Sequence, residues 1–282
     1  MNKSSAVLVQ ERARSNYILG HSQQEIERLI HQATVLGPIT ERLLRSAKIA
    51  PGMRVLDLGC GAGDVTMLAA QLVGEKGSVV GIDRNQEVLA LATERARERG
   101  LNQVRFQQAE VESFPSEEGF DLVIGRYILL HQSDPVHLVR SAARLVKPGG
   151  AIAFHEVRLT GRLDSLPFLP LWQTTGDLIL TGLRSALAHY DVSERLVECF
   201  SDAGLPQPNL FCETPIGAGP ESPLYGWLAL TLRSILPQLA KAGILVGQSV
   251  ELETLENRLR EAAVAARSQV ASPTQICAWA MI

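Results

Sequence analysis

The stretch Arg-Val-Leu-Asp-Leu-Gly-Cys-Gly-Ala-Gly at residues 54–63 decides the fold of this chain. Its apolar run at 55–58 is typical of a buried parallel strand. Gly59, Gly61 and Gly63 then alternate, and a helical pattern begins at Asp64. Glycine is favoured where the backbone takes a positive φ or where a ligand approaches closely. A strand, a glycine loop and a helix N-terminus predict a small-molecule site at the carboxyl edge of a sheet.

The spacing of the glycines separates two kinds of nucleotide site. The dinucleotide fingerprint G-x-G-x-x-G would place its third glycine at position 64, where this chain has Asp64. An acid there would also repel a pyrophosphate at the helix N-terminus. The pattern D-x-G-x-G-x-G instead resembles the first motif of the class I S-adenosylmethionine-dependent methyltransferases, the alternative being an ordinary tight turn. The resemblance implies that the cofactor S-adenosylmethionine is bound by Asp57, Gly59, Cys60, Gly61 and Gly63.

Residues 54–156 repeat a strand–helix rhythm. Strands are expected at 54–58, 78–83, 104–108, 120–125 and 151–157. Helices are expected at 64–73, 86–98 and 135–146. This alternation predicts an α/β fold with a doubly wound, mostly parallel sheet whose loops share one edge. The family resemblance implies a Rossmann-like sheet of seven strands.

Further segments extend the resemblance. Asp83 ends the second strand, 83 − 59 = 24 positions after the first glycine, near the spacing at which an acid meets a ribose. Residues 108–115 resemble the family segment whose acid meets the adenine amino group, with Ala109 and Glu110 in place of glycine and aspartate. The main chain after the fourth strand corresponds to the segment that meets the methionine end. The resemblance therefore implies cofactor contacts from Asp83, Arg84, Glu110, Val111, Gly125 and Arg126.

Two regions flank the core and divide the chain into three parts. An N-terminal helical cap segment is expected at 1–48, the cofactor-binding core at 49–160, and the completion of the sheet at 161–282. Within 15–48, a capping-box pattern at 22–25 predicts a helix from about residue 23, and Pro38 is expected to interrupt it. The last part is expected to carry a helical substrate-binding lid at about 220–270. Its expected elements are helices at 191–203, 224–242 and 250–266 and strands at 209–215 and 275–282.

Tyr17 and His21 precede the first predicted helix. In several small-molecule members of the family, an N-terminal segment folds over the methionine moiety, sometimes with a tyrosine on its carboxylate. The resemblance therefore implies Tyr17 as a cofactor contact, with a surface or packing role as the alternative.

Candidate bases for methyl transfer should lie at the carboxyl ends of the fourth and fifth strands. His131 follows the fourth strand, and His155 and Glu156 end the fifth. Histidine is the side chain most easily poised near neutrality, although each of these residues has a structural role as its alternative. Strand alternation places His155 and Glu156 on opposite faces. We therefore name His131, Glu156 and His155 as candidate catalytic residues.

Composition excludes several classes of function. Apolar residues are 46% of the 282 and charged residues 20%, a balance that supports a sizeable core. The net charge of −3 comes without a basic block, so no nucleic acid partner is expected. The apolar stretch at 224–246 is interrupted by charges and a proline, so no membrane partner is expected. The four cysteines are scattered, which indicates reduced thiols, a cytoplasmic location and no metal site.

The leading hypothesis is a methyltransferase that moves the sulfonium methyl group to an oxygen, carbon or nitrogen of a small organic molecule, in secondary metabolism. A second hypothesis keeps the cofactor but assigns non-methyl chemistry, such as cyclisation or decarboxylation. A third is a non-catalytic cofactor-binding protein that forms a homodimer through the helices at 224–242 and 250–266. Release of S-adenosylhomocysteine on mixing with an acceptor separates the first hypothesis from the second.

Overall fold

The computed structural model describes residues 23–115, 118–244 and 251–282. Their central element is a seven-stranded sheet in the order β3-β2-β1-β4-β5-β10-β7. Every neighbouring pair from β3 to β5 is parallel, whereas β10 runs antiparallel to both β5 and β7. The predicted α/β sheet is therefore confirmed. The strands are β1 (Arg54–Leu58), β2 (Ser78–Asp83), β3 (Val104–Gln108), β4 (Phe120–Arg126), β5 (Val146–Val157), β7 (Asn209–Glu213) and β10 (Gln275–Met281).

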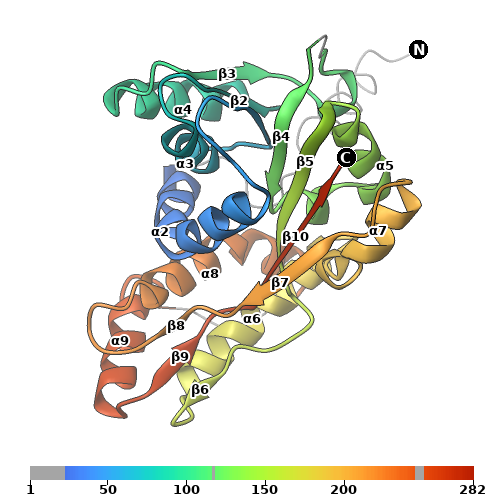
Figure 1. The fold of residues 1–282 in the computed structure, drawn as a ribbon. Helices are drawn as coiled ribbons and strands as arrows, with labels where there is room; N and C mark the ends of the chain where they lie inside the picture. Colours follow the sequence, from blue (N-terminus) through green and yellow to red (C-terminus); the bar gives the residue numbers. More distant parts are fainter. Residues whose placement is uncertain (1–22, 116–117, 245–250) are drawn as a thin grey trace, which may run out of the picture.

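Helices cover both faces of this sheet, and Figure 1 shows α2, α3 and α4 on one side and α5 and α7 on the other. On the first side, Leu43 and Leu44 of α2 share a core cluster with Val65 and Ala69 of α3. On the second side, Val139 of α5 and other helix residues enter the larger cluster. These helices are α2 (Gln23–Ser46), α3 (Asp64–Val73), α4 (Gln86–Glu98), α5 (Pro135–Ala143) and α7 (Leu196–Asp202).

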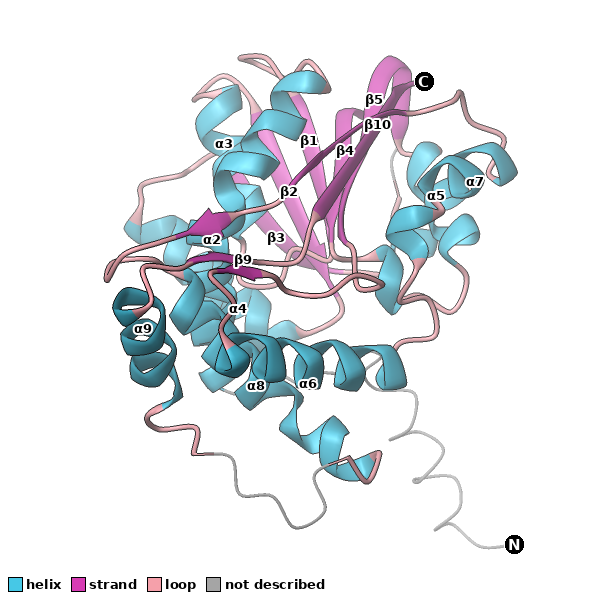
Figure 2. Ribbon diagram, turned by 90° about the horizontal axis from the view of Figure 1, so that it is seen from below, coloured by secondary structure: helices cyan, strands magenta, loops and turns pink. Residues whose placement is uncertain are grey.

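A second layer of helices crosses the carboxyl ends of the parallel strands. There α6 (Pro170–Ala186) packs against α8 (Leu224–Lys241), and α8 also contacts α2 and α9 (Leu255–Ala265). Figure 2 shows α6 and α8 lying across one end of the strands. Beside them is a small sheet in the order β6-β9-β8. Its strands are β6 (Ser165–Leu166), β8 (Ile216–Gly217) and β9 (Gln269–Ala271). Neither this small sheet nor α6 was predicted from the sequence.

Several predicted boundaries differ from the structure. Pro38 does not break the first helix, which runs unbroken over Gln23–Ser46. Burial of Leu36, Ile39 and Leu43 around the proline compensates for the single backbone hydrogen bond that proline removes. The helix predicted at 191–203 is a 3₁₀ turn, η3 (Val192–Glu194), followed by α7.

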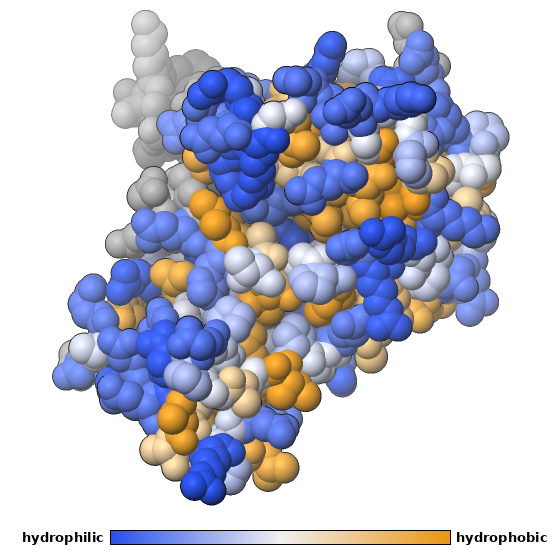
Figure 3. Space-filling view, turned by 60° about the vertical axis from the view of Figure 1, so that its left-hand side comes forward, coloured by the Kyte–Doolittle hydropathy of each residue, from blue (hydrophilic) through white to orange (hydrophobic). Residues whose placement is uncertain are grey.

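Two further predictions were off by several residues. The strand predicted at 151–157 begins at Val146, and its pairing with β4 has a register irregularity between Val146 and Ala151. The helix predicted at 250–266 is described only over Leu255–Ala265. On the face in Figure 3, hydrophilic side chains predominate and hydrophobic ones show in groups between them. No helix among the described residues is long and apolar enough to cross a membrane.

Candidate active site

The glycine loop after β1 leaves open space beside the backbone. A Cβ built on Gly61, at φ +51°, would meet only Leu29 Cδ1, at 3.9 Å. One built on Gly63, at φ +84°, would lie 2.8 Å from Cζ of Phe106. Both positions therefore favour glycine, the first for its backbone angle and the second also for space. Gly61 lines a cavity, whereas Gly63 lies behind the loop and does not.

Asp57 lies at the buried end of β1 and lines the cavity. Its Oδ2 accepts a hydrogen bond of 2.6 Å from Oγ1 of Thr66. Burial raises the pKa of Asp57 to about 7, and Thr66 and the positive charge of Arg126 oppose this shift. A cationic ligand group arriving beside Asp57 would favour its ionised form.

Asp83, at the end of β2, ties the glycine loop to the next turn. Its Oδ2 accepts a hydrogen bond of 3.0 Å from the Gly61 N–H, and its Oδ1 accepts one of 2.9 Å from the Asn85 N–H. Arg84 lies 3.5 Å from a carboxylate oxygen of Glu110 in a half-exposed ion pair. Asp83, Arg84 and Glu110 all line the same cavity.

The negative charge of Asp64 is compensated by an ion pair with Arg95, so it would repel a phosphate less than an unpaired acid would. Its Oδ1 lies 2.7 Å from Nη2 of Arg95, in an ion pair of which both side chains are nearly buried. Arg95 also donates to the carbonyl of Ala62. The pair therefore fixes the loop to α4, and the exclusion of a dinucleotide rests on the glycine spacing.

One cavity of about 700 Å³ joins this loop to the interior of the helical layer. We call its first part the cradle: the lining residues at 57–65, 82–88 and 108–111. We call its second part the inner chamber, lined by the 3₁₀ turn η2 (Leu129–His131) and by α2, α6 and α8. The apolar wall of the chamber includes Leu130, Trp172, Leu180, Leu183, Trp227 and Leu228.

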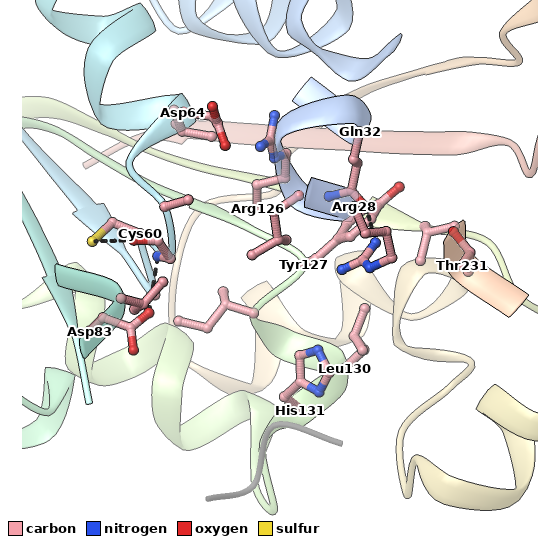
Figure 4. Close-up of a pocket in the computed structure, with 18 of the residues that line it drawn as sticks. Arg28, Gln32, Cys60, Asp64, Asp83, Arg126, Tyr127, Leu130, His131 and Thr231 are labelled. Atoms are coloured by element: carbon pink, nitrogen blue, oxygen red, sulfur yellow. Dashed lines mark hydrogen bonds between the residues drawn. The ribbon is translucent and has the colours of Figure 1, made fainter. Parts of the chain in front are cut away.

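The inner chamber also has polar lining groups. Arg28 and Gln32 come from α2, His131 from η2 and Thr231 from α8. Arg28 is only 4% exposed, and its Nη1 donates a hydrogen bond of 2.6 Å to Oε1 of Gln32. Figure 4 shows the guanidinium of Arg28 projecting into the cavity near Tyr127 and above His131. These α2 and α8 residues were not identified from the sequence, because no local motif marks them.

His131 is the predicted catalytic residue that lines the cavity. Burial, followed by the positive charge of Arg28, lowers its pKa to about 4. The imidazole is therefore neutral near pH 7 and in the form that accepts a proton.

His155 lies away from the cavity lining, inside the sheet. Its Nδ1 is 3.0 Å from Oγ1 of Thr40, and its Nε2 is 3.2 Å from Oε1 of Gln275. The hydroxyl of Tyr127 donates to the same Gln275 oxygen at 2.6 Å. Burial lowers the pKa of His155 to about 3, so it is a neutral member of a network that joins α2, β4, β5 and β10.

Glu156 is also absent from the cavity lining, and it is completely buried. Its Oε1 accepts hydrogen bonds from the main-chain N–H groups of Ile128, at 3.0 Å, and Leu129, at 2.9 Å. Burial raises the pKa of Glu156 to about 8, although these hydrogen bonds oppose the shift. The carboxyl group thus holds the start of the turn that carries His131.

The structure brings most of the predicted site residues to one cavity. Gly125 does not line it, because Ile128 packs over it: a Cβ on Gly125 would lie 2.6 Å from Ile128 Cγ2. Tyr17 and His21 lie outside the described residues. The predicted residues that do line the cavity are Asp57, Gly59, Cys60, Gly61, Asp83, Arg84, Glu110, Val111, Arg126 and His131. No cluster of three His, Cys, Asp or Glu side chains suited to a metal is found within 23–115, 118–244 and 251–282.

Known proteins resemble this chain mainly over the core. Residues 49–187 match a methyltransferase-domain family model. Aklanonic acid methyltransferase DauC of a Streptomyces species is 37% identical over 135 residues, which cover 47% of this chain and 60% of that protein. The ubiquinone/menaquinone biosynthesis C-methyltransferase UbiE of Shewanella sediminis is 36% identical over 115 residues, 40% of this chain and 46% of that protein. The chain thus spans about half to three-fifths of the length of these relatives.

Solved structures extend the likeness in fold beyond the core. The match to the YcgJ protein of Bacillus subtilis has 20% identity and a TM-score of 0.55, and it covers 88% of this chain and 97% of that protein. The match to the [4+2]-cyclase SpnF has 23% identity and a TM-score of 0.50, and it covers 84% of this chain and 80% of that protein. Residues 49–187, just under half of the chain, therefore form a methyltransferase domain of the class I S-adenosylmethionine-dependent kind.

Proposed function

We propose that this protein transfers the methyl group of S-adenosylmethionine to a small organic acceptor held in the inner chamber. The observation that carries the proposal is the continuous cavity of about 700 Å³ that joins the cradle to an apolar chamber. A cofactor in the cradle and an acceptor in the chamber would meet inside the protein. Holding two reactants in line supplies much of the rate enhancement in such reactions, about 7–11 kcal/mol in well-oriented systems.

The residues of the cradle fit the cofactor. Ile82, Val88 and Val111 offer an apolar wall for the adenine ring. Asp83 retains lone pairs that suit the hydroxyls of a ribose, and Glu110 lies farther along the same wall. The remaining proposed contacts are Asp57, Gly59, Cys60, Gly61, Gly63, Arg84, Gly125, Arg126 and, outside the described residues, Tyr17.

When bound, S-adenosylmethionine supplies a methyl group activated by a positively charged sulfur. Asp57 would hold the positive end of the ligand beside the glycine loop. The apolar wall of the chamber would exclude water and orient the acceptor. His131 is neutral in the free protein and would accept the acceptor's proton on an imidazole nitrogen, as a weaker base than a free imidazole because burial lowers its pKa to about 4. Glu156 and His155 would act at a distance by fixing the backbone around the chamber.

Two experiments test the proposal. Calorimetric titration with S-adenosylhomocysteine should show binding to the wild type that falls about tenfold or more in Asp83→Ala, because a charged hydrogen-bond acceptor is lost. Glu213→Ala is the matched control, since this acid pairs with Arg42 away from the cavity. Incubation with methyl-deuterated S-adenosylmethionine and a library of phenols, enols and carboxylic acids should give products that carry the labelled methyl group. Cofactor binding with conversion of an acceptor but no label transfer would refute methyl transfer and support non-methyl chemistry.

Other expectations from the sequence stay proposals. A reducing, cytoplasmic setting suits the four free thiols of the structure. The helices α8 and α9 expose less apolar surface for a homodimer interface than their sequences suggested. The apolar stripe of α8, including Leu232, Ile235 and Leu239, is buried within the chain. Sedimentation analysis would measure the oligomeric state.

A further inference from the structure

Arg126 lies at the boundary between the two parts of the cavity. It is the last residue of β4 and lines the cavity, and Figure 4 shows it between Cys60 of the cradle and Arg28 of the inner chamber. Its Nη1 donates a hydrogen bond of 3.3 Å to Oγ1 of Thr40 on α2. A guanidinium carries several N–H donors, and this is the hydrogen bond that Arg126 donates to a described residue. Donors therefore remain for a ligand.

The positive side chains on the described lining of the cavity are Arg28, Arg84 and Arg126. Arg84 pairs with Glu110, and Arg28 has partners that include a hydrogen bond within α2. Arg126 forms no ion pair with any described carboxylate, although its positive charge acts on the carboxyl group of Asp57. Arg126 is therefore the lining cation best placed to receive an anionic group of a ligand.

A buried hydrogen-bond network orients Thr40 toward Arg126. Gln275 donates from Nε2 to a main-chain carbonyl at 2.7 Å, so its Oε1 faces Nε2 of His155 at 3.2 Å. An amide oxygen only accepts, so the ring proton of neutral His155 is on Nε2, and Nδ1 accepts the Thr40 hydroxyl hydrogen across 3.0 Å. This hydrogen is thereby directed to His155 rather than to the Leu36 carbonyl at 3.1 Å. Thr40 then presents an oxygen lone pair to Nη1 of Arg126.

Asp57 supplies the opposite charge beside Arg126. It is paired in register with Ile124 of β4, two positions before Arg126, and side chains two positions apart leave a strand on the same face. Asp57 and Arg126 both line the cavity. A neighbouring acid and cation match the ammonium and carboxylate groups of an α-amino acid, which form one end of S-adenosylmethionine.

Resting on the proposed cofactor site, we propose that the guanidinium of Arg126 binds the methionine carboxylate of S-adenosylmethionine and that Thr40 and His155 position this guanidinium. A guanidinium presents paired donors that match the two oxygens of a carboxylate. Asp57 would face the amino group of the same ligand. His155 would thus contribute to cofactor binding through Thr40 as a positioning residue, without contact with the reacting atoms.

The test compares S-adenosylmethionine with decarboxylated S-adenosylmethionine, which lacks only the carboxylate, by calorimetric titration. The wild type should bind the carboxylate form about tenfold or more tightly, the effect of a charge-assisted hydrogen bond. In Arg126→Gln this preference should fall to within about twofold, because the loss of affinity falls on the carboxylate form. Arg42→Gln, on the exposed side of α2 and paired with Glu213, removes the same charge and should leave the preference unchanged.

Variants of Thr40 test the positioning role. Thr40→Val removes the hydroxyl at nearly constant volume, so the preference should fall about threefold or more, the effect of losing a hydrogen bond. Thr40→Ser keeps the hydroxyl and should restore the preference of the wild type. An unchanged preference in Thr40→Val overturns the role of Thr40 and His155.

Thermal unfolding establishes that each variant is folded. If Arg126→Gln is not, Arg126→Lys decides: it keeps the charge but loses the paired donors, so an intermediate preference is expected and an unchanged one overturns the inference. The inference is also overturned if the wild type binds both cofactor forms equally, or if both forms weaken equally in Arg126→Gln. If Arg126→Gln keeps the preference, the guanidinium serves another anion, such as that of the acceptor, and the inference fails. Arg28→Gln should keep the preference, and its loss there would place the carboxylate on α2 instead.

Methyl-transfer activity is measured separately. Its absence beside an intact, Arg126-dependent preference for the carboxylate form refutes the proposed function and leaves the Arg126 site standing. Methyl transfer by the wild type with a preference that Arg126→Gln does not change refutes only this inference.

Discussion

Replacing Glu156 by glutamine should make the protein more resistant to alkaline pH. The carboxyl group is completely buried, and its pKa is raised from 4.5 to about 8. A buried acid with a raised pKa contributes stability that is fully present below the unfolded pKa of 4.5 and is lost as the pH rises through about 8. Glutamine has nearly the same shape and does not ionise, so it lacks this loss.

The magnitude follows from the pKa shift. Each unit of difference corresponds to about 1.4 kcal/mol. Between about pH 5 and about pH 8.5, linkage therefore predicts that the wild type loses about 4 kcal/mol of unfolding free energy relative to Glu156→Gln. The glutamine Oε1 can still accept the hydrogen bonds from the Ile128 and Leu129 N–H groups, so the fold of η2 should survive.

Urea unfolding followed by circular dichroism at both pH values measures this difference. Other titrating groups, including Asp57 and His155, are common to the two proteins and cancel in the comparison. Glu156→Leu is the control: it removes the acceptor and should destabilise the protein at both pH values by about 2–6 kcal/mol, the cost of two buried unsatisfied donors. Parallel pH dependence in the wild type and Glu156→Gln would refute the assignment of a raised pKa to Glu156.

Three other changes test the cavity and its supports. Gly63→Ala should lower the unfolding free energy by about 1–3 kcal/mol through a strained φ and a clash. Gly52→Ala, in open space at φ +87°, should cost less, and equal losses in denaturant titrations would contradict the role of the clash. Arg95→Met leaves Asp64 without its buried partner and should cost about 3–5 kcal/mol, and a loss below about 1 kcal/mol would show that the pair is solvated. His131→Asn should reduce kcat about 10²–10⁴-fold if the ring accepts a proton. The pH profile of kcat/KM for the wild type should show no histidine titration near pH 6.5, since the pKa of His131 is about 4 in the free protein. A titration near pH 6.5 in the measured initial rates would argue against this assignment.

The cradle was predictable because its determinants are local. Asp57, the alternating glycines and Asp83 stand at fixed offsets from two strand ends, and parallel strands bring those ends to one edge. The structure places Asp57, Gly59, Gly61 and Asp83 along one cavity, as those offsets imply.

The inner chamber was not predictable from local pattern. Arg28 stands on a helix whose face is decided only when α8 packs against it, and a charged residue on an amphipathic helix normally faces solvent. Because α6 was not predicted from the sequence, the cavity-lining residues of that helix were not predicted either. Leu180 and Leu183 have no motif, and only the tertiary arrangement shows that they face a cavity.

The histidines show the same limit. Alternation along β5 correctly separates His155 from Glu156 but does not show that both faces are covered. With α2 on one side and η2 on the other, both side chains are buried and carry hydrogen bonds. Candidate acid–base residues at a strand end are therefore hard to rank until the covering helices are known.

The position of β10 has a consequence for how the protein is made. This strand fills the place between β5 and β7, yet it follows β5 only after α6, α7, α8 and α9 have been synthesised. Until then, the edge of β5 has unpaired backbone groups that can pair with another chain. A ribosome-bound or prematurely terminated chain that stops before Gln275 would thus expose a long apolar edge, and its yield in cells would depend on chaperones that cover it. The same chain would already contain every described cradle residue, so cofactor binding alone would be a poor measure of whether the protein is complete.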